Sequence, residues 1–384
     1  MELGCELRIL SGKNLLALLK SVDKGGYSLH NVALKGGLFQ MPELKFDKAK
    51  CDDCKAISCL VKCQYMNLDK NEAKKEWQKV INGEDSCVLK DCVTCYACEE
   101  YCPFGNHPFY FIVERQEEKG ILPQSRPITK QAINMTTAQG RFLLGKPEKT
   151  ALSFCAIPRL YTLATGKLFQ DVLPSWVLGA EFFCQAMFLH FARMSVIKEN
   201  LPKVIDNIWN QGIREVIFIH DECYGTFTKL APAYGIEVPF KPIHYFEYIY
   251  KRLKELSNEI KPLNIKAAYH RNCSARLVPE TDHFVDDIFG LIGVERVKRE
   301  YDHENALCCG GLLMTSKGYD LGHDVQKRNV DDMVKSGAEY CVFNCPACWD
   351  PLAEKVARRG IKPIHIIDLC KLAIGEKQAV EVTV

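Results

Sequence analysis

The chain has 384 residues, of which 47% are hydrophobic, and a formal net charge of +2. This length predicts two or three domains with real hydrophobic cores, and the ordinary Gly and Pro contents argue against disorder. Acidic and basic residues are interspersed, so we expect neither nucleic-acid binding nor a polybasic membrane patch. The longest apolar stretch, residues 182–196, contains polar residues and is shorter than the ~20 residues of a spanning helix, so no transmembrane segment is expected.

Cysteine is far more frequent than usual, with 20 residues. The chain starts Met-Glu-Leu-Gly without an apolar leader, so a secreted disulfide framework is not expected. Most of the cysteines instead follow spacings typical of iron–sulfur proteins. We therefore predict a reducing, oxygen-poor cytoplasm, with peripheral docking on a membrane complex as an alternative.

Residues 1–46 show modest helical patterning followed by a Gly-rich bend. They carry no recognisable chemistry, and we interpret them as an N-terminal docking arm.

Residues 47–120 contain two cysteine motifs. The second motif, Cys92-x2-Cys95-x2-Cys98-x3-Cys102-Pro103, has the bacterial ferredoxin spacing, in which three cysteines bind one cubane cluster and the fourth reaches its neighbour. The first motif is Cys51-x2-Cys54-x4-Cys59-x3-Cys63. Crossing the two motifs in this way predicts two [4Fe-4S] cubanes, one held by Cys51, Cys54, Cys59 and Cys102 and one held by Cys63, Cys92, Cys95 and Cys98.

The first motif departs from the ferredoxin pattern at two points. Four residues separate Cys54 from Cys59, and Gln64 stands where proline is usual. Paired cysteines can also bind zinc, which stays the alternative metal for these motifs.

Helices are expected between the motifs, over residues 67–83, and after them, over residues 109–118. This arrangement resembles the iron–sulfur halves of fumarate reductases and the C subunit of heterodisulfide reductase, and it predicts an α-helical two-cluster ferredoxin domain. Residues 121–149, which are rich in Gly and Pro, are expected to be a linker.

The remainder of the chain consists of two copies of one sequence unit. Residues 150–260 are a degenerate copy of residues 261–384: the segment 214–223 aligns with 339–348, and Lys-Pro-Ile-His recurs at His244 and His365. Short apolar strands alternate with helices in both copies, which predicts two parallel α/β repeats with ligands at strand ends. The overall fold class is thus α+β multidomain. The symmetry of the two histidines favours an architectural role for both.

The second copy carries five clustered cysteines. They lie at Cys273, in Cys308-Cys309-Gly310-Gly311 and in Cys345-Pro346-Ala347-Cys348. Thiolates at this density can surround a compact cationic cluster, and the glycines permit turns that bring the backbone close to it. The spacing resembles the cysteine-rich CCG domain of the heterodisulfide reductase family. That resemblance implies that these five cysteines hold a noncubane [4Fe-4S] cluster.

The first copy lacks two of the five ligands, because Phe183 replaces Cys308 and His220 replaces Cys345. Three interpretations remain open. Cys155, Cys184, Cys223 and His220 hold a further metal or altered cluster, since imidazole can replace thiolate. Alternatively, the site is an empty structural remnant, or His220 is a proton donor in a pocket.

The order of motifs over residues 51–375 resembles the D subunit of heterodisulfide reductase, the C subunit of anaerobic glycerol-3-phosphate dehydrogenase and the D subunit of ATP-independent benzoyl-CoA reductase. The resemblance implies an oxidoreductase subunit that transfers electrons within an anaerobic complex. Disulfide cleavage in that family uses two noncubane clusters, and this chain keeps one complete site, so electron transfer is favoured over a disulfide reductase. A zinc-stabilised scaffold is the third alternative.

The sequence contains no GxGxxG segment that opens a helix after a strand. Flavin or nicotinamide chemistry is therefore assigned to redox partners, either flavoproteins or other iron–sulfur subunits.

Overall fold

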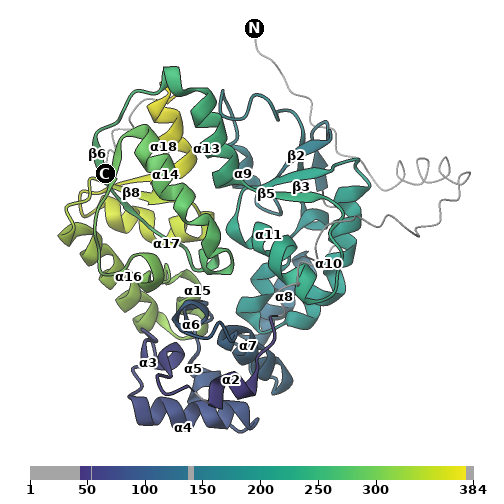
Figure 1. Cartoon of the computed structure of the whole chain (residues 1–384), viewed down its shortest axis with the longest axis vertical. Helices are drawn as coiled ribbons and strands as arrows, with labels where there is room; N and C mark the ends of the chain where they lie inside the picture. The colour runs from purple at the N-terminus through teal and green to yellow at the C-terminus, as the bar shows by residue number, and fades with distance from the viewer. Residues whose placement is uncertain (1–43, 53, 137–141, 378–384) are drawn as a thin grey trace, which may run out of the picture.

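The computed structural model describes residues 44–52, 54–136 and 142–377. A helical part lies below two α/β lobes, each built around its own sheet (Figure 1). The predicted docking arm lies outside the described residues, apart from residues 44–46.

The helical part contains both cysteine motifs of the N-terminal third. Its helices are α2 (Lys48–Asp52), α3 (Ser58–Val61), α4 (Lys70–Ile81), α5 (Cys87–Asp91), α6 (Ala97–Tyr101) and α7 (Pro108–Glu118). The helices expected over residues 67–83 and 109–118 are confirmed as α4 and α7. Asp69 starts α4 through a reciprocal capping box with Glu72, and Gly83 follows its end with a φ of 74°.

The segment predicted as a linker, residues 121–149, has regular structure, which corrects that expectation. It contains α8 (Arg126–Thr136) and β1 (Phe142–Leu144). Pro127 lies in the first turn of α8, where a proline is compatible with a helix rather than a sign of a loop. Strand β1 pairs antiparallel with β3 (Trp176–Gly179) and becomes the edge of the first sheet.

The first lobe is built on a five-stranded sheet in the order β1-β3-β2-β4-β5, parallel apart from β1. Its other strands are β2 (Thr150–Ser153), β4 (Glu215–Phe218) and β5 (Lys241–His244). Its α-helices are α9 (Pro158–Tyr161), α10 (Met194–Trp209), α11 (Asp221–Gly225), α12 (Ala231–Ala233) and α13 (Tyr245–Glu255). Short helical turns are η1 (Ala180–Phe182), η2 (Ala186–Phe191), η3 (Thr226–Leu230) and η4 (Ser257–Glu259).

The second lobe is built on a parallel four-stranded sheet in the order β7-β6-β8-β9. Its strands are β6 (Ile265–Tyr269), β7 (Val294–Arg296), β8 (Tyr340–Phe343) and β9 (Lys362–His365). Its α-helices are α14 (His283–Ile292), α15 (Gly311–Ser316), α16 (Tyr319–Lys335), α17 (Pro346–Ala357) and α18 (Ile366–Ala373), and its short turns are η5 (Cys273–Leu277), η6 (Pro279–Thr281) and η7 (His303–Asn305). In both lobes the first parallel strand lies between the second and the third, and the fourth lies beyond the third.

The two symmetric histidines are buried helix caps, which confirms their predicted architectural role. The Nδ1 of His244 accepts a hydrogen bond from the backbone of Phe246 at the start of α13. The Nδ1 of His365 accepts one from Ile367 at the start of α18. Each side chain satisfies a helix N–H that would otherwise lack a partner.

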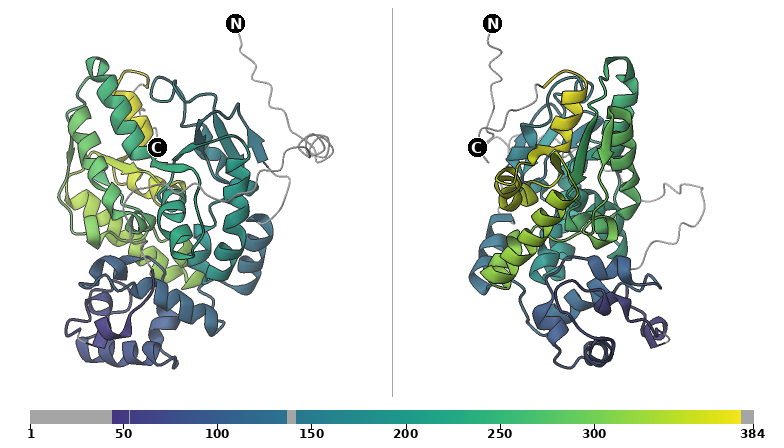
Figure 2. Two further views of the ribbon diagram at one scale, coloured as in Figure 1. Left: turned by 45° about the vertical axis from the view of Figure 1, so that its right-hand side comes forward. Right: turned by 90° about the vertical axis from the view of Figure 1, so that its left-hand side faces the viewer.

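The two lobes share one hydrophobic core. Helix α13 of the first lobe packs against α14 of the second. Buried residues of both sheets, such as Ile217 in the first and Val342 in the second, belong to the same cluster. The further views in Figure 2 show the helical part beneath both lobes. Because burial of apolar surface fixes the lobes against each other, side chains from both can build one site.

Among the described residues, no helix is both long and apolar enough to span a membrane.

Candidate functional site

An outer cavity in the helical part is lined by four cysteines that come from both motifs, namely Cys51, Cys54, Cys59 and Cys102. The indole Nε1 of Trp77 donates to the sulfur of Cys51 over 2.8 Å, and the backbone N–H of Asn106 donates to that of Cys102 over 3.3 Å. Burial strongly raises the pKa of the Cys59 thiol, and the nearby cysteine sulfurs raise it further. Sulfurs that are crowded together, at least partly buried and approached by N–H donors suit thiolates bound to a cationic cluster.

A second cavity lies next to the first and is lined by Cys59, Cys63, Cys92, Cys95 and Cys98. The N–H of Thr94 donates to the sulfur of Cys92 over 3.4 Å. Burial raises the pKa of Cys92 to about 12 and that of Cys63 to about 11. Without a bound cation these thiols would therefore remain protonated at neutral pH.

A central cavity of about 1120 Å³ lies between the two lobes and the helical part. All five clustered cysteines line it, namely Cys273, Cys308, Cys309, Cys345 and Cys348. The opposite wall comes from the first lobe and is mostly apolar, with Phe142, Leu143, Leu178, Phe183 and Met187 among its residues. A cavity of this volume can hold a bound cofactor or a small molecule, and its wall offers sulfur ligands on one side and apolar contacts on the other.

Four of the five cysteines lie in strand-end loops and turns, and Cys348 lies in the first turn of α17. Cys345 follows β8 at the N-cap position of α17, while Cys273 opens the turn that follows β6. Gly310 has a φ of 75°, and a Cβ there would lie 2.7 Å from the carbonyl oxygen of Gly322. A side chain at Gly310 would therefore displace the neighbouring turn, as the motif predicts.

Hydrogen bonds favour thiolates at two of these cysteines. Hydrogen bonds from Cys308 and Cys348 hold the pKa of Cys309 well below its usual range despite burial. A hydrogen bond from Cys348, followed by the charge of His220, lowers the pKa of Cys345 to about 6 against the opposing effect of burial. The N–H of Cys308 donates to the hydroxyl of Tyr65, which extends from the helical part.

His220 does not belong to the group formed by the three cysteines with which the sequence associates it. Its Nε2 lies 3.3 Å from the sulfur of Cys345 in the second lobe. Burial lowers the pKa of His220, but the Cys345 thiolate and nearby carboxylates outweigh burial and raise it to about 10. The sulfurs of the other three predicted ligands, Cys155, Cys184 and Cys223, all lie within 4.8 Å of one another. The first lobe thus contributes a histidine to the central cavity and keeps a separate three-thiol group.

A chain of polar side chains that the sequence analysis missed links the helical part to Cys345. The Nδ1 of His190 lies 3.0 Å from the hydroxyl of Thr94, between Cys92 and Cys95. Its Nε2 lies 3.4 Å from the carboxylate of Glu222, which in turn lies 4.0 Å from Nδ1 of His220. The available signal was the presence of His190 within the longest apolar stretch, where a buried polar side chain needs a partner.

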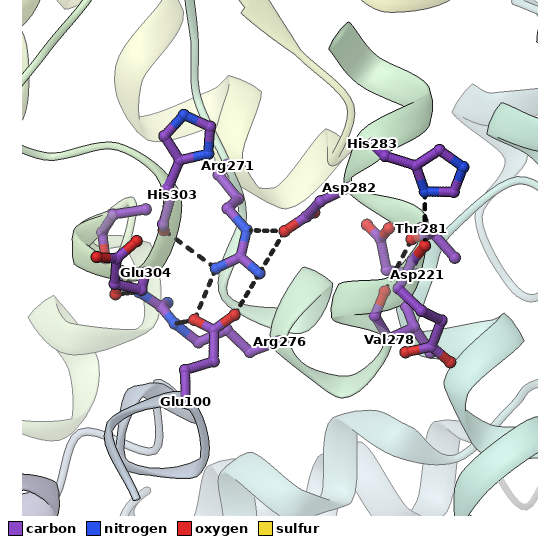
Figure 3. Close-up of polar contacts among 12 residues, drawn as sticks. Glu100, Asp221, Arg271, Arg276, Val278, Thr281, Asp282, His283, His303 and Glu304 are labelled. Carbon is purple, nitrogen blue, oxygen red and sulfur yellow. Dashed lines mark hydrogen bonds and ion pairs between the residues drawn. The ribbon is translucent and has the colours of Figure 1, made fainter. Parts of the chain in front are cut away.

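A buried ion-pair network, also missed, joins the helical part to the second lobe (Figure 3). The carboxylate of Glu100 in α6 accepts hydrogen bonds of 2.6 and 2.8 Å from Arg271 and one of 2.9 Å from Arg276. Arg276 also donates to the carbonyl oxygen of Cys95, and Arg271 pairs with Asp282. Both arginines lie within three residues of Cys273, so the network fixes the central cavity against the cluster motifs.

A second buried network joins the two lobes. Asp221 of the first lobe accepts hydrogen bonds from Asn272 and Asn344 of the second, each over 2.9 Å, and pairs with Nε2 of His244 at 3.0 Å. Burial would raise the pKa of Asp221, but these partners hold it well below its usual range. The two asparagines adjoin Cys273 and Cys345, so this network also positions ligand-bearing turns.

Residues 267–350 match the family model of the cysteine-rich CCG domain. This segment is a CCG domain. The chain is also 20% identical over 318 residues to the EtfAB:quinone oxidoreductase of Syntrophomonas wolfei. That similarity covers 70% of the chain but 43% of the relative, so the chain spans less than half of that protein. Both similarities agree with a heterodisulfide-reductase-like iron–sulfur protein. All five cysteines of the central cavity lie within the CCG segment, four of them in the CCGG and CPAC motifs.

Proposed function

We propose that this protein is an iron–sulfur electron-transfer subunit of an anaerobic oxidoreductase complex. In this proposal the outer and second cavities each hold a [4Fe-4S] cubane, through the crossed ligand sets given above. The five cysteines of the central cavity hold a noncubane [4Fe-4S] cluster. Bound in these places, the clusters would supply one-electron transfer between a surface partner and the central cavity.

The observation that carries the proposal is the succession of three cysteine-lined cavities. Cys59 lines both the outer and the second cavity, and Val93 lines both the second and the central cavity. Adjacent cavities of this kind would bring redox groups close enough together for electron transfer from one to the next. Tyr65, which lines the second cavity, accepts a hydrogen bond from the N–H of Cys308 in the central one. Thr94 and Glu100 join the helical part to His190 of the first lobe and to Arg271 of the second.

The outer cavity is the point where a redox partner would exchange electrons. Phe104 lines it and is 47% exposed, and Lys50 lies at the same wall. An exposed aromatic ring beside a basic residue suits a transient protein interface. The name of the Syntrophomonas relative combines EtfAB with a quinone, and we take these as candidate classes of partner for this chain.

We infer in addition that the helical part is a two-cluster ferredoxin domain and that the two lobes arose by duplication. The matching order of four parallel strands and the matching histidine caps support the duplication.

A reductase that acts on a disulfide in the central cavity is the second candidate. The specific observation in its favour is the cavity volume of about 1120 Å³, which gives a small molecule room beside the cysteines. His220 and the His190–Glu222 pair of the first lobe line the same cavity and provide polar groups there.

Iron analysis of anaerobically purified protein tests the proposal. We expect about 12 irons per chain, from two cubanes and one four-iron noncubane cluster, together with the broad visible absorption of iron–thiolate proteins. A colourless protein that contains zinc alone would support a scaffold and refute the proposal. Rapid disulfide reduction by the isolated chain with an artificial donor would favour the reductase.

A further inference from the structure

A fourth cavity lies between α8 and the start of α10, apart from the three that the cysteines line. Its volume is about 430 Å³. Its wall comes from the segment after α7, from α8 and from the residue that precedes α10. It shares no lining residue with the outer, second or central cavity. A cavity of this volume has the size of a small-molecule site.

Three cationic side chains line this cavity, which we call the basic cavity. They are Arg126 and Lys130 of α8 and Arg193, which comes directly before α10. Among the described residues, no carboxylate belongs to its wall. Arg126 and Lys130 are exposed and Arg193 is half-buried, so a ligand from solvent can reach these charges. The cavity thus offers positive charge without a matching negative charge.

The two arginines of the basic cavity differ from the other arginines of the protein. Within the described parts of the chain, all arginines form an ion pair with a carboxylate except Arg126, Arg193 and Arg214. The guanidinium of Arg214 stacks on Trp209, 3.4 Å from the centre of the ring. The remaining two have neither kind of partner, and both line the same cavity.

The contacts of Arg193 leave its charge uncompensated. It donates a hydrogen bond of 3.0 Å to the carbonyl oxygen of Ala192, its neighbour in the chain. Glu117 is the carboxylate that contacts the start of α10, and it accepts hydrogen bonds from the backbone and the hydroxyl of Ser195 instead. Lys130 likewise forms no ion pair within the described residues.

The three charges repel one another in this arrangement. Arg126 and Lys130 lie four positions apart on α8, where side chains are neighbours and like charges destabilise a helix. Arg193 adds a third charge from a separate element. A bound anion would relieve this repulsion, and guanidinium groups bind phosphate through paired hydrogen bonds. The arrangement therefore favours a phosphate as the ligand.

Apolar side chains complete the basic cavity. Leu122 and Ile133 line it beside the cations. Small-molecule sites typically combine apolar contacts with a few polar groups that fix the orientation of the ligand. This combination suits a phosphate that is attached to a less polar group, as in a nucleotide or a phospholipid, better than a bare inorganic anion.

We propose that the basic cavity binds a phosphate-bearing molecule. The phosphate lies among the three cationic side chains, and the less polar part of the molecule lies against Leu122 and Ile133. This inference goes beyond the proposed function, because it gives the chain a ligand outside the three cysteine-lined cavities. A soluble nucleotide and the headgroup of a membrane phospholipid share the chemistry that the cavity recognises.

Equilibrium binding to the full chain tests both sources of the phosphate. One arm titrates ADP by isothermal calorimetry. The other measures co-sedimentation with phosphatidylcholine vesicles that contain phosphatidylglycerol, with pure phosphatidylcholine vesicles as the neutral reference. We expect saturable binding in one arm that weakens as salt is added, because salt screens exposed charges. Binding of ADP would identify a soluble nucleotide, and binding that requires phosphatidylglycerol would identify a lipid headgroup.

Substitutions locate the binding in the basic cavity. Arg126→Ala and Arg193→Ala should each weaken it roughly tenfold, because each removes charge-assisted hydrogen bonds to the phosphate. Arg214→Ala is the matched control. It removes the same charge from an arginine that also lacks an ion pair but lies outside the cavity, so it should retain the affinity.

Two results would overturn the proposal: no binding in either arm, or equal affinities for Arg126→Ala and Arg214→Ala. Because Arg126 is exposed, its replacement should leave the fold intact, and circular dichroism checks this. The test is separate from that of the proposed function, since a chain that binds the phosphate ligand without iron would retain this inference and refute the other.

Discussion

The two lobes have the same order of four parallel strands but very different sites at the ends of those strands. In the second lobe five cysteines line a wide cavity, whereas in the first lobe three cysteines close on one another. Phe183 and His220 stand where the second lobe has cysteines, and both line the cavity of the other lobe. The first lobe therefore forms one wall of the central cavity. The two positions that lack cysteines give this wall an apolar ring, from Phe183, and a polar group near Cys345, from His220.

The proposed difference between the two lobes depends most on a cluster bound to the five cysteines of the central cavity. We expect Cys309→Ser to lower the iron content from about 12 to about 8 per chain, because a noncubane cluster that loses one of its five ligands is not retained. Iron analysis and electron paramagnetic resonance of the oxidised protein measure this. Cys341→Ser is the control, since Cys341 is a fully buried thiol of β8 outside the cavity, and it should keep all of its iron. Full iron in Cys309→Ser would remove that residue from the ligand set.

The attachment of the second lobe to the helical part gives the next largest effect. Glu100→Ala leaves Arg271, which is 1% exposed in its side chain, and Arg276 buried without their shared carboxylate. We expect a loss of about 3 kcal/mol in stability, because Arg276 would keep only backbone carbonyl partners and become an uncompensated buried charge, while Arg271 keeps Asp282. Thermal unfolding followed by circular dichroism measures it.

The control for that experiment is Glu114→Ala, at an exposed position of α7, which should change stability little. Equal melting temperatures for the two variants would show that the Glu100 network contributes nothing to the attachment.

The smallest expected effect concerns His220, through which the first lobe contacts a cysteine of the central cavity. His220→Phe removes the contact of 3.3 Å with the Cys345 sulfur. Hydrogen bonds and positive charge near cluster sulfurs raise the reduction potential, so we expect the potential of the central cluster to fall by about 60 mV, a tenfold change for a one-electron couple. A redox titration monitored by electron paramagnetic resonance measures the shift.

His220→Gln, which keeps a side-chain donor, should restore part of the potential. His283→Phe, at an exposed histidine, should leave it unchanged. A potential in His220→Phe equal to that of the unmodified protein would mean that the histidine has no influence on the cluster.

Local patterns in the sequence predicted a large part of this architecture. The helix expected over residues 67–83, the apolar runs of β4 and β8, and the parallel pairing of all strands other than β1 follow from short-range chemistry. The cysteine spacing likewise predicted that Cys102 would lie with the first motif rather than the second, and the structure brings these residues to one cavity.

Contacts between distant segments could not be predicted in this way. The direction of His220 depends on how one lobe faces the other, and nothing near residue 220 in the sequence indicates Cys345. The ion pairs of Glu100 join residues more than 170 positions apart. The linker expectation failed for a local reason, because Pro127 in a first helical turn and Pro127 in a loop look alike in sequence.

Helix α6 has one further consequence, for the maturation of the protein. It is five residues long, and the two cysteines at its ends, Cys98 and Cys102, line different cavities. Between them Glu100 engages the turn that bears Cys273. On the proposed ligation, a cluster bound in either cubane position would fix α6. It would thereby place the ligand of the other cubane and the Glu100 carboxylate that contacts Arg271 and Arg276 of the second lobe. Cofactor insertion would then be cooperative, and partly loaded chains would be rare among purified molecules.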